Sequence, residues 1–438
     1  MRIGVIGAGA AGLAAAFDFA RAGHGVTVYE AAPFAGGQAS TIEVGGGRLE
    51  LGYHHLFTND SAILGLMTEL GIDGSMRWIP STVGIYTDGK VYRWSTPLDL
   101  LRFGAISLRD RIRFGLLAKR LERMKDWRSL EGVPAAQWIR DNAGSSVYEK
   151  VWEPLLRGKF GDRFESIGMP WFWSKIQTRF ASRDRLGREK LGYPVNSFDE
   201  VFETLVEQIQ AKGGQVHLNT PVTRVLVEDG AANGLRVKRP DGSEADEPFD
   251  LVLSTTPSFA FPELVDLPDA YVEKLNAVEY MGAVVMILEM THPLTSVYWM
   301  NIADHEVPFL GLIEHTNLMP PEMYGGSHVL YLTNYLERHD DLYLMSEDDL
   351  LEVYLPYLAR FNPSFDRSWI KRVHHNRVSA AQPVIGTNYS ERIPEHQTPV
   401  RNLFLANTTQ IYPEDRGTNY SVRMGREVAA MMLRGDDE

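Results

Sequence analysis

The chain contains 438 residues, of which 44% are hydrophobic and 23% are charged, a composition that is ordinary for a globular protein. Its length suits two domains, and its formal net charge of -13 argues against a general nucleic-acid-binding protein. Cysteine is absent, which excludes dithiol redox chemistry, thioether attachment of a cofactor and zinc sites built on thiolates; no metal site is predicted.

A nucleotide-binding pattern occupies the first thirty residues. The apolar run 3–6 predicts a buried strand, 13–22 has helical spacing, and 26–29 predicts a second strand that ends at Glu30. The first strand and the helix are joined by Gly7, Ala8, Gly9, Ala10, Ala11 and Gly12. These glycines permit a tight turn, close approach to a diphosphate and close helix packing, and the helix N-terminus attracts negative charge. Glu30 is placed to bind ribose hydroxyls, so the pattern predicts a dinucleotide other than NADP.

The residues after Glu30 indicate which dinucleotide is bound. Residues 31–41 read Ala-Ala-Pro-Phe-Ala-Gly-Gly-Gln-Ala-Ser-Thr, and here the chain resembles the flavin amine oxidase superfamily, which includes protoporphyrinogen oxidases and phytoene desaturases. The resemblance implies that FAD is the cofactor and that a glycine turn runs beneath its diphosphate and ribityl chain. The matching residues are Ala31, Gly36, Gly37, Gln38 and Ala39, with Gln38 where the family often has a basic residue.

Other segments resemble the parts of that family that contact FAD. Gly52 and Tyr53 would run past the flavin, Val222 would meet the adenine through its backbone, and Thr255 would lie near the cofactor. Near the C-terminus, the family motif that brings a helix N-terminus to the flavin is matched by Gly417, Thr418, Asn419 and Tyr420. Where the family usually has Gly-Asp, this chain has Asn407 and Thr408, so Asn407 is the candidate for the contact of the missing carboxylate.

The expected fold class is α/β, with a discontinuous Rossmann-like FAD-binding domain of the GR2 type and an α+β substrate domain made of an antiparallel sheet and helices. The FAD-binding domain is expected to comprise residues 1–75, 193–258 and 395–438, and the substrate domain residues 76–192 and 259–394. Locally, the pattern predicts a hairpin between 235–238 and 249–254 and a terminal helix over 424–433.

Candidate catalytic residues follow from basic side chains and from the family resemblance. His54 and His55 would lie near the reactive edge of the flavin, Arg157 and Lys159 follow a segment after which related oxidases line their substrate cavity, and Arg416 belongs to the C-terminal motif. The alternative for the histidines is a polar turn with hydrogen-bonded imidazoles, and the alternative for Arg157 and Lys159 is surface charge. A second basic cluster could bind a diphosphate or carboxylate: Arg179, Arg183, Arg185, Arg188 and Lys190.

Residues 98–124 form a helical stretch that is locally basic in an acidic chain. Peripheral contact with anionic lipid, or a site for an acidic substrate, is one interpretation. A solvated helix face over a domain core is preferred, because Arg109, Arg111 and Arg113 are too closely spaced to define one face. The nucleotide motif begins at the third residue, so no signal peptide and a cytoplasmic location are expected. The longest apolar run, 281–288, is too short for a membrane span and predicts a buried strand.

The predicted function is that of an FAD-dependent oxidoreductase, an oxidase or a dehydrogenase or desaturase. A hydride would pass from a small lipophilic or amine substrate to flavin N5 and then to oxygen or another acceptor. The alternative is a non-redox flavoenzyme that resembles UDP-galactopyranose mutase and acts on a nucleotide sugar, which the arginine clusters favour. A third possibility is a non-catalytic FAD-binding protein. Substrate identity and oligomeric state stay open.

Overall fold

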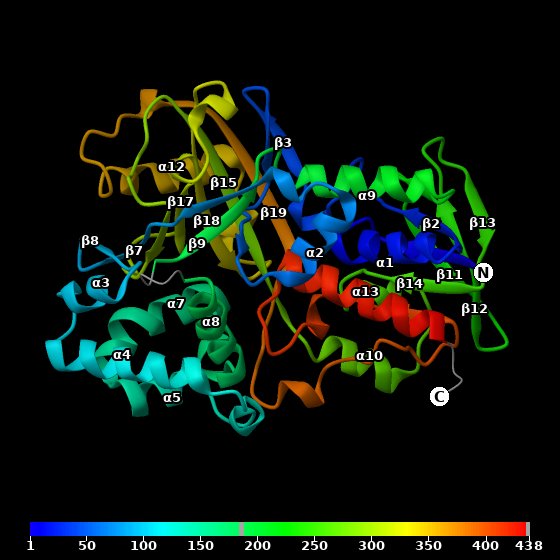
Figure 1. Ribbon diagram of the computed structural model, residues 1–438, viewed down its shortest axis with the longest axis horizontal. Coiled ribbons are helices and arrows are strands. Elements are labelled where there is room, and N and C mark those ends of the chain that lie inside the picture. Colours follow the sequence, from blue (N-terminus) through cyan, green and yellow to red (C-terminus); the bar gives the residue numbers. More distant parts are fainter. Residues whose placement is uncertain (184–187, 435–438) are drawn as a thin grey trace.

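A parallel five-stranded sheet forms the core of the N-terminal body in the computed structural model, which describes residues 1–183 and 188–434 (Figure 1). All four strand pairs are parallel, and the first strand of the chain lies in the middle of the sheet. In sheet order the strands are β10 (Gln215–His217), β2 (Gly25–Tyr29), β1 (Arg2–Ile6), β14 (Leu251–Ser254) and β20 (Leu403–Leu405). Segments from three distant parts of the chain therefore build one parallel sheet.

Helices cover one face of this sheet and a smaller sheet covers the other. The helices are α1 (Ala10–Arg21), α2 (Ser61–Leu70), α9 (Asp199–Ala211) and α13 (Thr418–Arg434), and they share one apolar core with the sheet. The α1–α13 contact is tight, because a Cβ at Gly425 would lie 2.1 Å from the carbonyl oxygen of Ala11. On the other face the antiparallel strands β11 (Val222–Glu228), β12 (Ala231–Lys238) and β13 (Glu244–Pro248) share a second apolar core with the sheet.

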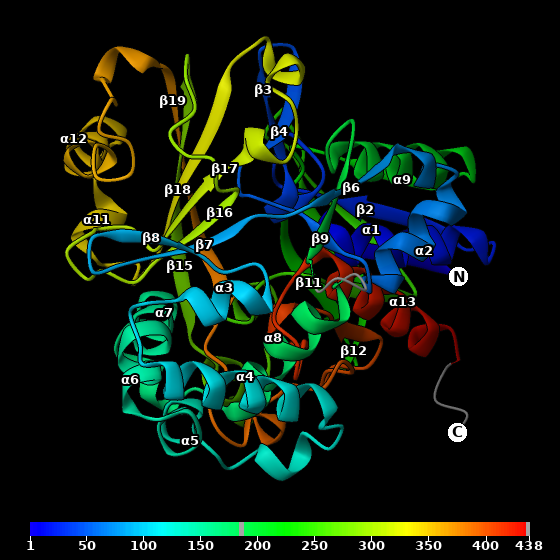
Figure 2. The same ribbon diagram turned by 60° about the vertical axis from the view of Figure 1, so that its left-hand side comes forward.

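A seven-stranded sheet forms the core of the second body (Figure 2). Its pairs are antiparallel except for the parallel pair β16–β7. In order the strands are β19 (Ile370–Pro383), β15 (Tyr280–Met290), β18 (His328–Leu336), β17 (Gly311–Glu314), β16 (Trp299–Ile302), β7 (Val83–Thr87) and β8 (Lys90–Arg93). Alternate residues of β15 divide between two cores: Val284 and Met286 pack with α12 (Glu347–Leu358), while Val285 and Ile287 face the first body.

A helical lobe lies below this sheet in Figure 2 and completes the second body. It contains α3 (Pro97–Arg102), α4 (Leu108–Arg123), α5 (Ala135–Ala143), α6 (Ser145–Val147), α7 (Glu153–Phe160) and α8 (Met169–Ala181). Phe114, Leu117 and Leu121 turn one face of α4 into the lobe's apolar core, but Ile112 is half exposed at 50%. The apolar residues of α4 therefore lie on two faces of the helix.

The remaining elements are short. They are the pair β3 (Thr41–Val44) and β4 (Gly47–Glu50), the small sheet β5 (Leu56–Phe57), β9 (Lys190–Pro194) and β6 (Met76–Pro80), and the short helices α10 (Asp269–Asn276) and α11 (Asp341–Leu344). Helices α10 and α11 pack on the first and the second body respectively. Ser346 caps α12 by accepting a hydrogen bond from the Asp349 N–H. Among the helices of the described ranges, none combines the length and apolarity that a membrane-spanning segment requires.

Two local expectations are wrong. The strand that pairs with 235–238 is β13, while 251–254 joins the parallel sheet beside β1. Each of these segments is short, and sequence pattern does not separate a hairpin partner from a central strand. The terminal helix begins at Thr418 rather than Met424, so the C-terminal motif is itself the first turn of α13.

Glu50 is a buried carboxyl group where the bodies meet. It accepts hydrogen bonds from the Tyr193 hydroxyl (2.7 Å) and the Phe198 N–H (2.8 Å), and its own carbonyl oxygen accepts one from Tyr331 (2.8 Å). Burial raises the pKa of Glu50 from 4.5 to about 7. Burial also raises the pKa of Glu314, a second buried carboxyl group, to about 7.

We therefore expect the contribution of Glu50 to stability to fall as pH rises from 4.5 to 7. The buried neutral histidines His54, His55 and His315 instead contribute stability that rises with pH up to about 6.5. Between pH 4.5 and 7 Glu50 binds more protons in the folded state than in the unfolded state, so its added stability is fully present below pH 4.5 and is lost through pH 7. For Glu50 alone the loss is roughly 3 kcal/mol. Urea unfolding of the unaltered protein and of Glu50→Gln between pH 4.5 and 8 measures it, because the difference in stability between the two should change by this amount across the window while the other titrating groups are common to both. A Glu50→Gln profile as steep as that of the unaltered protein would contradict this assignment.

Candidate active site

The glycine turn after β1 has the geometry that a diphosphate site requires. Gly7 has a positive φ of 103°, and a Cβ at Gly12 would lie 2.1 Å from the carbonyl oxygen of Gly7. Gly37 approaches Gly9 so closely that a Cβ there would lie 3.2 Å from the Gly9 Cα. The first N–H groups of α1, from Ala10 onward, have no partner within the helix and point out of its N-terminus. The two glycine segments thus meet at a positively polarised helix end.

Glu30 lies at the end of β2, beside this turn. Its carboxylate oxygens accept hydrogen bonds from the N–H groups of Ala8 and Ala32, each at 2.8 Å. The carboxylate thereby holds the turn in place, and each of its oxygens keeps a second lone pair for a ribose hydroxyl. Gln38 is directed elsewhere: its side-chain amide donates to the carbonyl oxygen of Ala380 in β19 (2.9 Å).

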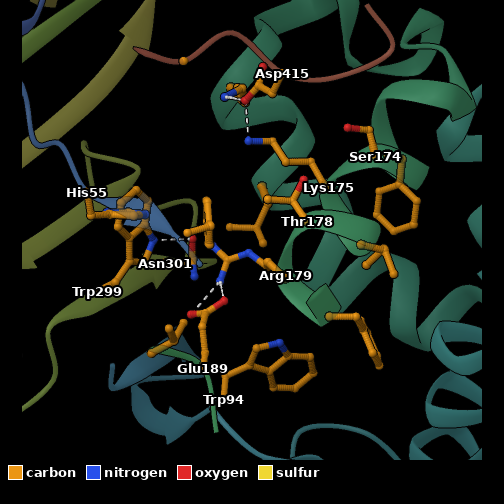
Figure 3. Close-up of a pocket in the computed structure, with 18 of the residues that line it drawn as sticks. His55, Trp94, Ser174, Lys175, Thr178, Arg179, Glu189, Trp299, Asn301 and Asp415 are labelled. Carbon is orange, nitrogen blue, oxygen red and sulfur yellow. Dashed lines mark hydrogen bonds and ion pairs between the residues drawn. The ribbon is translucent and has the colours of Figure 1, made fainter. Parts of the chain in front are cut away.

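A cavity of about 920 Å³ lies between the helical lobe, the seven-stranded sheet and the N-terminus of α13 (Figure 3). The loop 53–57, strands β7, β16 and β18, and helices α3, α4, α7 and α8 form its walls. Much of the wall is aromatic or aliphatic, and six Lys or Arg side chains line it against four Asp or Glu. The cavity is large enough for a substrate-sized molecule and is cationic on balance.

Asp415 is the centre of a buried ion-pair cluster in this cavity. It pairs with Lys159 (3.1 Å) and with Lys175, and it accepts hydrogen bonds from the indole N–H of Trp171 and the amide of Gln382, both at 2.9 Å. Figure 3 shows Lys175 extending from α8 to Asp415. Burial raises the pKa of Asp415, but the two lysines and Arg416 outweigh it and hold that pKa well below its usual range. Burial lowers the pKa of Lys175 to about 8, against the attraction of Asp415.

Arg416 joins this cluster to a tyrosine pair. It donates to the hydroxyl of Tyr335 at 2.7 Å, and that hydroxyl lies 3.5 Å from the hydroxyl of Tyr53. Burial raises the pKa of Tyr335, but Arg416 and Lys159 outweigh it and lower the pKa to about 8. The buried Nε of Arg416 has no hydrogen-bond partner among the described residues, so one donor remains available beside the cavity.

His54 and His55 both line the cavity, and both are neutral at pH 7. The Nδ1–H of His54 donates to the carbonyl oxygen of Gly52 (2.5 Å), and Nδ1 of His55 is hydrogen-bonded to the Tyr298 hydroxyl (3.2 Å). Burial lowers the pKa of His54 to about 4 and that of His55 to about 3. The imidazoles therefore add hydrogen-bonding groups but no charge to the wall.

Arg179 lies one helical turn beyond Lys175 on α8 and faces Glu189 (Figure 3). Its guanidinium lies 3.3 Å and 3.4 Å from the two carboxylate oxygens of Glu189, whose side chain is only 5% exposed. Arg183 lines the same cavity. Arg185, another predicted member of this basic cluster, lies outside the described residues. The remaining two members, Arg188 and Lys190, belong to the second described range, which begins at residue 188.

The cavity collects four of the five predicted catalytic residues: His54, His55, Lys159 and Arg416. Arg157 is not among its lining residues. It pairs with Glu153 (2.6 Å) and stacks over the ring of Phe164, with 45% of its side chain exposed. Residues 157 and 159 are two apart on α7, so they project from nearly opposite sides of the helix.

The predicted cofactor residues near the C-terminus divide into two groups. Gly417, Thr418, Asn419 and Tyr420 line the cavity at the N-terminus of α13. The Asn419 side chain also accepts hydrogen bonds from the N–H groups of Ala62 and Ile63 (3.0 and 3.2 Å), which fixes α13 against α2. Asn407 is instead buried, caps the turn that begins at Thr408, and donates to the carbonyl oxygen of Thr256 (2.9 Å).

Two predicted residues lie beside the parallel sheet. Thr255 follows β14, and its hydroxyl donates to the carbonyl oxygen of Ile6 (2.8 Å) beside the glycine turn. Val222 begins β11 and is half-buried. Thr255 therefore supports the glycine turn directly, whereas Val222 lies at the start of the smaller sheet.

Sequence reasoning missed Lys175 and Asp415 as site residues. Trp171, Lys175 and Arg179 recur every four residues, which places them on one face of a helix, and this spacing was the available signal for Lys175. Asp415 carried no such signal, because its partners come from α7, α8 and β19.

The residues present fit FAD on three observations. The glycine turn admits a close diphosphate, Glu30 has acceptor capacity for a ribose, and the N-terminus of α13 opens into the cavity, where the family resemblance places the flavin ring. At that helix end, backbone N–H groups and Arg416 would stabilise negative charge on a reduced ring.

Comparison with known proteins agrees with this fit. The family of flavin containing amine oxidoreductases matches residues 10–433. The "Probable zeta-carotene desaturase" of Synechococcus elongatus is 25% identical over 487 residues, which covers 99% of this chain and 98% of that protein.

Solved structures share the fold. An oxidoreductase from Methanosarcina mazei superposes with a TM-score of 0.75 at 19% identity, covering 99% of this chain and 100% of that one. Reduced UDP-galactopyranose mutase also has a TM-score of 0.75, at 15% identity, covering 100% and 94% of the two chains. From the family match over residues 10–433, this chain belongs to the flavin-containing amine oxidoreductases and is an FAD-dependent oxidoreductase.

Proposed function

We propose that this enzyme dehydrogenates an apolar organic molecule in the 920 Å³ cavity, and that a protonated amine is a poor substrate. The observation that carries the proposal is the composition of the cavity wall. Aromatic and aliphatic side chains cover much of it, including Phe114, Trp152, Phe172 and Trp299, and its charged part is cationic on balance. Such a wall favours apolar surface through the hydrophobic effect.

The carboxylates of the cavity do not offer an amine a free anionic partner. Asp415 is engaged with two lysines and two neutral donors, and Glu189 is engaged with Arg179. A protonated amine about 4 Å from the Lys175 or Arg179 cation would be repelled by that cation by roughly 4 kcal/mol at an effective dielectric constant near 20. This is the repulsion by the cation alone, before the opposing attraction of Asp415 or Glu189 is subtracted. An uncharged substrate avoids this cost.

The redox chemistry is that of a dehydrogenation, in which one hydride and one proton leave neighbouring carbons and a double bond forms between them. Bound FAD would supply the hydride acceptor, N5, with oxygen or another oxidant as the final electron acceptor. A neutral imidazole of His54 or His55 is the proposed acceptor of the proton. The chain's own contribution is to exclude water with its aromatic wall and to hold positive charge at Lys159 and Arg416. His54 and His55 remain proposed contacts to substrate, neutral by virtue of their lowered pKa values, whereas Arg157 is left out of this set. The relative named as a zeta-carotene desaturase supports an extended apolar polyene as substrate.

Anaerobic titration of the FAD-loaded enzyme tests this choice of substrate. We expect flavin absorbance near 450 nm to bleach with an apolar polyene presented in detergent and to persist with putrescine or benzylamine at pH 7. Lys175→Met is the matched variant: if its cation repels amines, amine affinity should rise severalfold while polyene reduction continues. If amines bleach the flavin absorbance at lower concentrations than polyenes do, the proposal is contradicted and the enzyme is an amine oxidase instead.

A second candidate function is favoured by the same cationic balance of the wall. An anionic nucleotide sugar would be attracted to Lys175, Arg179 and Arg416, and the fold of reduced UDP-galactopyranose mutase is shared. In that case turnover of UDP-galactopyranose should occur only after the flavin is reduced, with no net oxidation of the sugar. A flavin that no donor reduces would point to the third possibility, a non-catalytic FAD-binding protein.

A further inference from the structure

Helices α3 and α4 present a line of exposed apolar side chains, here called the outer ridge: Leu98, Leu101, Leu108, Ile112 and Leu116. Each is at least 46% exposed, and Leu116 is 69% exposed. On α4 the three members are four residues apart, so they follow one face of the helix. The buried residues Phe114 and Leu121 occupy the opposite face, which leaves α4 apolar on two sides. A globular surface helix normally has one apolar stripe.

The outer ridge is contiguous because α3 packs on α4. Arg111 of α4 donates to the carbonyl oxygen of Leu101 (2.6 Å), and a Cβ at Gly115 would meet the side chain of Leu100 at 3.5 Å. Figure 1 places α3 and α4 together at the left-hand edge of the molecule, and in Figure 2, where that side comes forward, both lie at the front. Of the twelve exposed large hydrophobic residues in the described chain, five belong to this pair of helices. Clustering of this kind marks an interaction surface.

Unpaired arginines flank the outer ridge. Arg102, Arg109, Arg120 and Arg123 are exposed, and none of their side chains forms a hydrogen bond or ion pair with another residue of the described ranges. The acidic residues of the same helices are already engaged: Asp99 and Asp110 in helix capping, and Glu122 with Lys119. In a chain of net charge -13, this surface is locally cationic and therefore complementary to an anionic one.

We propose that the outer ridge docks on an anionic lipid bilayer, with the apolar side chains in the acyl boundary and the flanking arginines at the lipid phosphates. An amphipathic helix with this distribution lies in the plane of a membrane interface. Its arginines strengthen binding because each cation near an anionic leaflet adds about fivefold in partitioning. Docking requires no spanning helix.

The position of the outer ridge relative to the cavity gives docking a consequence. The inward sides of the same helices supply Pro97, Leu100, Phe114, Gly115 and Ala118 to the cavity wall. One layer of helix therefore separates the outer ridge from the cavity. If the substrate is apolar, as proposed above, a docked enzyme would hold its cavity next to the lipid in which that substrate dissolves; docking itself does not depend on the substrate.

Vesicle sedimentation of the FAD-loaded full chain tests the proposal. We expect sedimentation with vesicles of phosphatidylcholine and phosphatidylglycerol in equal parts, and little with phosphatidylcholine alone. Leu108→Gln/Ile112→Gln/Leu116→Gln should reduce binding at least tenfold while keeping helix propensity. Arg120→Glu/Arg123→Glu should reduce it by about twentyfold or more, because two cations are lost and two anions gained.

Two control variants make the same kinds of substitution at exposed residues outside the outer ridge. Leu344→Gln/Val227→Gln removes exposed apolar side chains from other elements, and Lys212→Glu/Lys238→Glu makes the same change in net charge far from α4. Both should bind vesicles as the unaltered chain does, and retained flavin absorbance shows that every variant is folded. The proposal is overturned if the unaltered chain does not sediment with the vesicles, or if the outer-ridge variants sediment as the unaltered chain does. It is also overturned if the only effect of the triple leucine and isoleucine variant is to convert a dimer to a monomer, because a second copy of the chain would then cover the outer ridge.

Discussion

Asp415→Asn is expected to destabilise the protein by about 3–5 kcal/mol, the cost of removing one partner from a buried ion pair. Asparagine keeps the size of the side chain and can still accept from Trp171 and Gln382, but it cannot neutralise Lys159 and Lys175. Urea unfolding at pH 7 measures the change. We also expect loss of substrate-driven flavin reduction, because the cluster that holds Arg416 and Tyr335 is disrupted.

The loss of stability caused by Asp415→Asn should become smaller as pH rises. Burial already lowers the pKa of Lys175 to about 8, against 10.5 for an ordinary lysine, and loss of Asp415 removes an attraction that opposes the burial effect. Between these values the unfolded chain binds more protons than the folded one, so stability rises with pH. The double variant Asp415→Asn/Lys175→Met should be more stable than the single one. Additive losses in this double-mutant cycle would show that the two residues are not coupled.

Gly12→Val is expected to abolish FAD binding, with an affinity loss of at least about a hundredfold, equivalent to roughly 2.7 kcal/mol. A Cβ at this position would lie 2.1 Å from the carbonyl oxygen of Gly7, which is backbone and cannot rotate away. The start of α1 must therefore move from the glycine turn, and its N–H groups lose their alignment toward a diphosphate. Flavin absorbance per chain after gel filtration, and calorimetric titration of the apoprotein with FAD, measure the loss.

Gly65→Ala is the matched control for that change. Gly65 lies on the exposed side of α2, and a Cβ at this position would have no neighbouring atom within 4 Å among the described residues. Alanine should therefore keep FAD binding and add about 0.5–1 kcal/mol of stability. Normal FAD content in Gly12→Val would refute the role assigned to the glycine turn.

The nucleotide-binding half of the fold was predictable because its signals are local. Gly7, Gly9, Gly12 and Glu30 lie within one strand–helix–strand unit, and each has a backbone or carboxylate role that its spacing specifies. The C-terminal motif was likewise recognisable in sequence, although its helix begins six residues earlier than predicted.

The cavity was less predictable because its polar centre is assembled from distant segments. Asp415 meets Lys159, Lys175 and Gln382, which are separated from it by as many as 256 positions, and sequence pattern does not encode such pairings. On α7, helix geometry turns Lys159 inward and Arg157 toward Glu153, but the sequence alone does not say which of the two faces the cavity. On α4, spacing alone did not show that Ile112 and Leu116 lie on an outer face.

The absorbance spectrum of the purified protein tests most directly whether this chain binds FAD and uses it for redox chemistry. We predict flavin bands that correspond to one FAD per chain, that bleach with anaerobic dithionite and that return when air is admitted. Fast return indicates oxygen as the acceptor, and slow return indicates a dehydrogenase that uses another one. A protein that shows no flavin bands, even after incubation with FAD and gel filtration, would contradict the account.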